Sequence, residues 1–171
     1  SESDTRTTAA RQFVALNGRV LAYRELPGTG TPVLLIHGIG SSGDTWGDIP
    51  DRLSARGVAV VSVDLPGHGE SSRGPGDYSL GSTASTLRDL LDHLGIERVH
   101  LVGHSLGGGV SMQFAYQFPE RVDTMTLVSS GGLGEETFTG LRAASLPGSE
   151  FALKWAINAR TLKGASWVGD K

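Results

Sequence analysis

Four short, almost wholly apolar runs recur along the chain, and each is followed by a glycine or a polar residue. They are Val33–Ile36, Val58–Val63, Val99–Val102 and Met125–Val128. Runs with so few polar positions are typical of strands buried on both faces, as in parallel sheets covered by helices. The chain is therefore expected to build a largely parallel sheet.

Segments with helical periodicity separate these runs. Four leucines between residues 87 and 94 form one apolar stripe with i, i+3, i+4, i+7 spacing, and Gly95 follows as a stop. Shorter helices are predicted over Asp48–Arg56 and over Leu106–Phe118, which Pro119 ends. Alternating strands and helices form right-handed βαβ units. The predicted fold class is α/β, a mostly parallel sheet with flanking helices.

The start of the chain has a different pattern. Asn17-Gly18 separates two short apolar runs, Phe13–Leu16 and Val20–Tyr23, and predicts a β-hairpin. Residues 1–11 are mostly polar and are expected to form a flexible N-terminus.

A sequence of the form G-x-S-x-G stands where the third apolar run meets a helix: Gly103-His104-Ser105-Leu106-Gly107. A strand before it and a helix after it are the setting of a nucleophile elbow. So sharp a turn strains the serine backbone and leaves room only for tiny residues at 103 and 107. The Leu106 N–H would lie at a helix N-terminus, where it can stabilise an oxyanion. We predict Ser105 as a nucleophile; the alternative is a glycine-rich turn with an incidental serine.

A second oxyanion donor is expected from the loop after the first apolar run, His37-Gly38-Ile39-Gly40. The Ile39 N–H is the candidate, because the glycines on either side let the backbone approach a substrate closely. His37 could act as a catalytic base, but we favour a structural hydrogen-bonding role for it.

Together these elements resemble the α/β-hydrolase superfamily of esterases and lipases. The segments that carry the resemblance are residues 37–40, Asp64-Leu65-Pro66-Gly67-His68-Gly69-Glu70-Ser71, residues 103–108 and Phe118-Pro119-Glu120-Arg121-Val122. The resemblance covers roughly residues 12–134, which we expect to form strands one to six of the family's core. It also implies that Asp64 closes a turn without acting in catalysis. Trp46 resembles a position near the active-site entrance, although a core tryptophan explains it equally well.

In this family an acid and then a histidine follow the serine, after two further strands. Ser105 needs such a base, because a serine hydroxyl is a weak nucleophile without one. The last histidine here is His104, whose place on the elbow turns it away from the hydroxyl. We therefore expect the acid and the histidine beyond Lys171, with the C-terminal strands and helices absent from this chain. Glu135 and Glu136 are alternative acids, although they more simply begin a solvated helix.

Residues 135–171 are expected to begin a helical lid, since Glu135–Leu146 and Glu150–Leu162 have helical patterns with no strand between them. The apolar side chains Phe151, Trp155 and Trp167 suggest an apolar substrate group. Without the two further strands, the run Met125–Val128 would be left with an open edge and an uncovered face.

Composition narrows the function classes. The 171 residues carry a net charge of −3 and no cysteine, and the lysines and arginines form no basic stripe, so nucleic acid is not an expected partner. No apolar run approaches the roughly 18 residues of a membrane span, and a cytoplasmic location is expected. Neither metal-ligand spacing nor a phosphate-binding loop occurs, so no cofactor or metal is predicted. Nothing in the sequence indicates an oligomeric state.

Two hypotheses about function follow. The first is a serine hydrolase that cleaves a small ester-like substrate by acyl transfer through Ser105. The second is a non-catalytic binding or signalling protein that keeps the hydrolase scaffold. A carbon–carbon bond hydrolase of the same family remains open within the first hypothesis.

Overall fold

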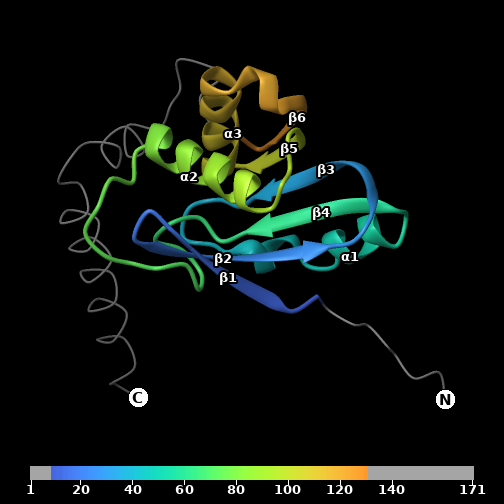
Figure 1. Cartoon of the computed structure of the whole chain (residues 1–171), viewed down its shortest axis with the longest axis horizontal. Coiled ribbons are helices and arrows are strands. Elements are labelled where there is room, and N and C mark those ends of the chain that lie inside the picture. The colour runs from blue at the N-terminus through green and yellow to red at the C-terminus, as the bar shows by residue number, and fades with distance from the viewer. Residues whose placement is uncertain (1–8, 131–171) are drawn as a thin grey trace, which may run out of the picture. The chain divides into compact units, whose positions relative to one another are not determined.

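The computed structural model describes residues 9–130, and the structural statements below concern these residues. They form one six-stranded sheet in the order β1-β2-β4-β3-β5-β6 (Figure 1). The strands are β1 (Arg11–Leu16), β2 (Arg19–Leu26), β3 (Thr29–Ile36), β4 (Val58–Val63), β5 (Val99–His104) and β6 (Val122–Val128). The pairs β3–β4, β3–β5 and β5–β6 are parallel, whereas β1–β2 and β2–β4 are antiparallel. The predicted α/β fold with a mostly parallel sheet is confirmed.

Helices cover both faces of the sheet. They are α1 (Ile49–Ser54), α2 (Leu80–His93) and α3 (Leu106–Gln117), with the short 3₁₀ turns η1 (Gly43–Trp46) and η2 (Pro119–Arg121). The side chains of β3 contribute to the cores on both faces, because alternate side chains of a strand point to opposite faces of the sheet. Leu34 and Ile36 join the core cluster under α2 and α3, whereas Leu35 joins a smaller cluster with Trp46. None of the helices in residues 9–130 is both long and apolar enough to cross a bilayer.

The N-terminal hairpin forms where Asn17-Gly18 predicts it. Both residues have positive φ, 51° and 78°, as a two-residue hairpin turn of this type requires. The predicted flexible segment 1–11 extends too far, because Arg11 is already the first residue of β1. Its guanidinium lies 2.5 Å from a Glu70 oxygen and 2.7 Å from an Asp44 oxygen, and these ion pairs hold it in place.

The helix ends depend on capping. The Ser79 hydroxyl accepts from the Ser82 N–H at the start of α2, and Gly95 follows the helix with a φ of 68°. Helix α3 ends at Gln117, one residue before the predicted end, and α1 is three residues shorter than predicted: it lacks Asp48 at the start, and Ala55 and Arg56 at the end.

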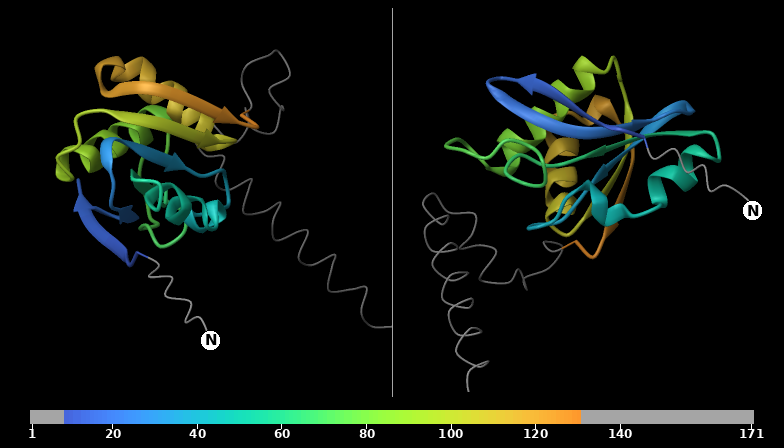
Figure 2. Two further views of the ribbon diagram at one scale, coloured as in Figure 1. Left: turned by 90° about the vertical axis from the view of Figure 1, so that its right-hand side faces the viewer. Right: turned by 90° about the horizontal axis from the view of Figure 1, so that it is seen from below.

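Strand β6 is not buried on both faces, as its apolar run taken alone predicts, but has the open edge and exposed side chains expected in the absence of two further strands. It begins at Val122, and Met125 and Val128 are 40 % and 41 % exposed. Among the described residues β6 pairs only with β5, so it forms one edge of the sheet while β1 forms the other (Figure 2). The two helices predicted within residues 135–171 lie outside the described part of the chain.

Candidate active site

Ser105 occupies the turn between β5 and α3 in a strained conformation. Its φ of 52° and ψ of −114° lie in a region that serine rarely adopts. Its N–H donates to the Val128 carbonyl at 3.1 Å, and its own carbonyl accepts from the Gly108 N–H at 2.9 Å. The backbone is therefore fixed on both sides, while the hydroxyl makes no capping bond to α3.

The glycines that flank the serine stand where a side chain cannot fit. A β-carbon at Gly103 would overlap the Gly107 carbonyl and lie 2.5 Å from Ser111 Oγ. A β-carbon at Gly107 would overlap the Ile36 carbonyl of β3. These close approaches are the steric reason for glycine that the sequence pattern predicts.

The loop after β3 lies directly beside the elbow. Ile36 pairs in register with Gly103, which brings the ends of β3 and β5 together. A β-carbon at Gly38 would be 3.3 Å from Ser105 Cβ and 3.1 Å from His104 Nδ1. The structure thus brings together the two segments in which Ser105 and Ile39 were predicted.

Two backbone amides near this junction are the predicted oxyanion donors. No residue between 9 and 130 accepts a hydrogen bond from the Ile39 N–H or from the Leu106 N–H. Leu106 is the first residue of α3, so its N–H belongs to the positive end of the helix dipole. Within the described part of the chain, both amides are therefore unused hydrogen-bond donors.

His37 is fully buried, and both of its ring nitrogens are engaged. Nδ1 lies 2.7 Å from the Gly38 carbonyl, and Nε2 accepts from the Leu65 N–H at 2.9 Å. Burial lowers the pKa of His37 below its ordinary value, and the nearby His68 lowers it further. A neutral ring with no free nitrogen is suited to a hydrogen-bonding role rather than to that of a base.

Asp64 is a buried carboxylate that holds two loops together. It accepts from the Gly43 N–H at 2.7 Å and from the Glu70 N–H at 2.9 Å, and the Arg11 guanidinium lies 3.9 Å away. Both carboxylate oxygens are thus used within the fold, which agrees with a turn-closing role. Sequence reasoning missed the Gly43 N–H and Arg11 as partners, because no local pattern marks contacts so distant along the chain.

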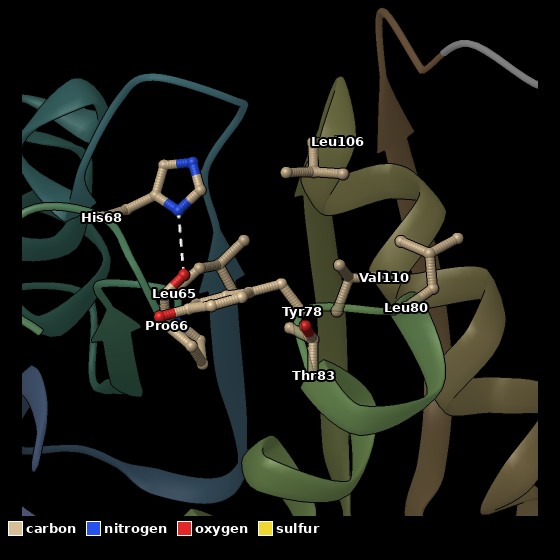
Figure 3. Close-up of a pocket in the computed structure, with 8 residues that line it drawn as sticks. All are labelled: Leu65, Pro66, His68, Tyr78, Leu80, Thr83, Leu106 and Val110. Atoms are coloured by element: carbon tan, nitrogen blue, oxygen red, sulfur yellow. Dashed lines mark hydrogen bonds between the residues drawn. The ribbon is translucent and has the colours of Figure 1, made fainter. Parts of the chain in front are cut away.

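A cavity of about 50 Å³ lies beside the first turn of α3 (Figure 3). Its walls are Leu65, Pro66, His68, Tyr78, Leu80, Thr83, Leu106 and Val110. Leu106 and His68 stand on opposite walls, and His68 Nδ1 lies 3.1 Å from the Pro66 carbonyl. Because a carbonyl only accepts, Nδ1 is the protonated nitrogen of this contact. Sequence reasoning did not single out His68, although it stands in the 64–71 segment.

Among residues 9–130, no group of three or more His, Asp or Glu side chains is placed to bind a metal ion.

A family model described as the alpha/beta hydrolase fold matches residues 31–156. The chain belongs to the α/β-hydrolase family. This α/β hydrolase is 50 % identical over 140 residues to an uncharacterized protein of Mycobacterium tuberculosis, covering 81 % of the chain and 40 % of that protein. It is 34 % identical over 142 residues to the 2-hydroxy-6-oxo-6-phenylhexa-2,4-dienoate hydrolase of Comamonas testosteroni, covering 81 % of the chain and 49 % of that enzyme.

Solved structures show the same likeness. A thermophilic esterase from Thermogutta terrifontis is similar to this α/β hydrolase with a TM-score of 0.68 and 30 % identity. The match covers 78 % of this chain and 50 % of the esterase. The chain thus spans between 40 % and 50 % of the length of these three relatives.

Proposed function

We propose that this α/β hydrolase is a serine hydrolase that cleaves a carboxylic ester by acyl transfer, with Ser105 as the nucleophile. The observation that carries the proposal is the conformation of Ser105. A positive φ at a serine costs stability, and the neighbouring backbone enforces it through two hydrogen bonds at 2.9 Å and 3.1 Å. A binding module without chemistry gains nothing from that strain.

In the proposed reaction, Ser105 Oγ attacks the ester carbonyl carbon and forms a tetrahedral intermediate. The carbonyl oxygen becomes an oxyanion, and the Leu106 and Ile39 amides donate to it. The intermediate expels the alcohol and leaves an acyl-Ser105 ester, which water then hydrolyses. The proton of Ser105 Oγ passes to a histidine and from it to the leaving alcohol. In the second half of the reaction the same histidine takes a proton from the attacking water and returns it to Ser105 Oγ as the carboxylic acid leaves. We assign this histidine, with its acid partner, to the complete protein beyond residue 171. On this assignment the 171-residue chain alone is inactive.

The proposed substrate is a small ester with an apolar group. Support comes from the cavity beside Leu106, most of whose lining is apolar. The esterase among the structural relatives supports the same reaction class.

The test is covalent labelling of the complete protein with a fluorophosphonate probe, which reacts with activated serines. We expect labelling of the wild type, none of Ser105→Ala, and wild-type labelling of Ser85→Ala. Ser85 is the control because its hydroxyl donates to the Gly81 carbonyl within α2, away from the elbow. A folded wild type without label would overturn the proposal and leave the non-catalytic binding protein as the better account.

A carbon–carbon bond hydrolase is the second candidate, favoured by the relative from Comamonas testosteroni. Turnover of 2-hydroxy-6-oxo-6-phenylhexa-2,4-dienoate would be compared with turnover of p-nitrophenyl esters of increasing chain length. Faster turnover of the dienoate, lost in Ser105→Ala, would favour this second function.

A further inference from the structure

The hydrogen bonds of His37 fix which of its nitrogens carries the proton. The Leu65 N–H donates to Nε2 at 2.9 Å, and a backbone amide cannot accept, so Nε2 must present a lone pair. In a neutral imidazole the proton then lies on Nδ1. Nδ1 is 2.7 Å from the Gly38 carbonyl, to which it donates.

The same carbonyl belongs to the peptide that carries the Ile39 N–H. This peptide bond is trans, so its C=O and its N–H point in opposite directions. The Ser41 N–H also donates to the Gly38 carbonyl, at 3.3 Å. The carbonyl is therefore held toward His37, and the Ile39 N–H is turned away from it.

We propose that His37 is a positioning residue of the oxyanion hole: its neutral Nδ1–H tautomer holds the Gly38–Ile39 peptide so that the Ile39 N–H points at the reacting oxygen. This role rests on the proposed function. It goes beyond a general structural role, because it assigns a separate task to each ring nitrogen. If the proton were on Nε2, two hydrogen-bond donors, Nε2–H and the Leu65 N–H, would face each other. Nδ1 could then no longer donate to the Gly38 carbonyl, and the loop after β3 would be released.

The surroundings of His37 keep the ring neutral. It is fully buried, and among residues 9–130 the ionisable groups that face it are His68, with ring centroids 5.2 Å apart, and Asp64. Asp64 favours a charged ring, but both of its oxygens accept backbone bonds and Arg11 lies 3.9 Å from one of them. Burial, the largest cause, and His68 oppose the charge, whereas the hydrogen bond to the Gly38 carbonyl favours it, and on balance the pKa of His37 is lowered.

Two substitutions in the complete protein test the roles of the two ring nitrogens separately. His37→Asn places an amide N–H near the position of Nδ1, so it keeps the donor to Gly38 and loses the acceptor for Leu65. His37→Gln reaches the position of Nε2, so it keeps the acceptor and loses the donor. Both variants lose the buried ring, so the stability lost with the ring is common to the two and does not distinguish them.

Ester hydrolysis would be measured for both variants. We expect kcat to fall about 100-fold or more in His37→Gln but less than about 10-fold in His37→Asn, with KM within about threefold in both. Equal losses of kcat, or a larger loss in His37→Asn, would overturn the positioning role. No turnover by the wild type would instead overturn the proposed function, and this role with it.

A second measurement does not depend on the activity of the variants. Long-range ¹H–¹⁵N correlation spectra of the wild type, assigned with His37→Asn, report which nitrogen of His37 is protonated. We expect the Nδ1–H tautomer at pH 7. An Nε2–H tautomer or a charged ring at that pH would overturn the proposal even if both variants lost activity.

Discussion

The Ser105 N–H donates to the Val128 carbonyl at 3.1 Å, which ties the elbow to the end of the neighbouring strand β6. Just beyond that strand, the Ser130 side chain occupies the space that a β-carbon at Gly108 would need. On the other side, Gly107 lies against the Ile36 carbonyl of β3. The strained turn is therefore held from two neighbouring strands at once, as a strained residue requires.

Gly107→Ala should destabilise the fold, because the new methyl group overlaps the Ile36 carbonyl, which belongs to the sheet and cannot move aside cheaply. The expected loss is about 3 kcal/mol, the upper part of the usual range for overpacking. Urea unfolding of the complete protein measures it.

Gly109→Ala is the matched control, two residues further along α3. A β-carbon there meets only Leu80 side-chain atoms, at 3.8 Å, which is ordinary contact. The substitution should stabilise the protein by about 0.5–1 kcal/mol through helix propensity. Equal effects of the two substitutions would contradict the tight packing described for Gly107.

Gly38→Ala should lower activity more than stability. Its β-carbon would lie 3.1 Å from His104 Nδ1 and 3.3 Å from Ser105 Cβ, so the loop must shift by a few tenths of an ångström. Such a displacement of a donor beside the nucleophile should slow fluorophosphonate labelling about 10-fold. The unfolding midpoint should change little, and a labelling rate equal to that of the wild type would show that the loop is not part of the site.

Local features of the sequence predict much of this fold. The leucine stripe over residues 87–94 and the stop at Gly95 locate α2, and Asn17-Gly18 locates the hairpin. The glycines around Ser105 could be predicted because their reason is steric and lies within a few residues of the turn. Each of these features involves residues that are close together in the sequence.

Contacts between distant segments could not be predicted in this way. Arg11 looks like part of a polar terminus, yet it bonds to Asp44 and Glu70, which are distant in sequence. The apolar residues of β6 taken alone predict burial on both faces, and its exposure could be expected only by considering which elements would cover it. The Nε2 contact of His37 joins residues 28 positions apart, so its ring geometry was also invisible in the sequence.

Asp64→Asn should destabilise the fold without removing the nucleophile. Asn presents one oxygen and one amide group where two backbone N–H donors now meet a carboxylate, so one donor loses its partner. We expect a loss of about 2–3 kcal/mol. Asp48→Asn is the control: that side chain is exposed, its Arg52 pair is 4.0 Å long, and its loss should cost less than about 0.5 kcal/mol. Probe labelling of the folded Asp64→Asn protein should persist, and its complete loss would give Asp64 a catalytic role.

The lowered pKa of His37 predicts how stability depends on pH. Above its ordinary value of 6.5 the ring is neutral in both the folded and the unfolded chain, so its contribution to stability is complete and constant. As the pH falls below 6.5, the unfolded chain takes up the proton first, because the folded pKa is lower. The free energy of unfolding therefore declines as the pH falls toward the folded-state pKa.

His37→Asn should remove this part of the pH dependence. Urea unfolding of the complete protein at pH 7.5 and pH 5.5 should show a larger loss of stability in the wild type than in the variant. Groups far from His37 titrate alike in both proteins and cancel in the comparison, so the difference belongs to His37 and its coupling to the neighbouring His68. The same loss in both proteins would mean that the His37 ring becomes charged as readily in the folded state as in the unfolded one. The donor–acceptor pattern at Leu65 could not then be holding it neutral.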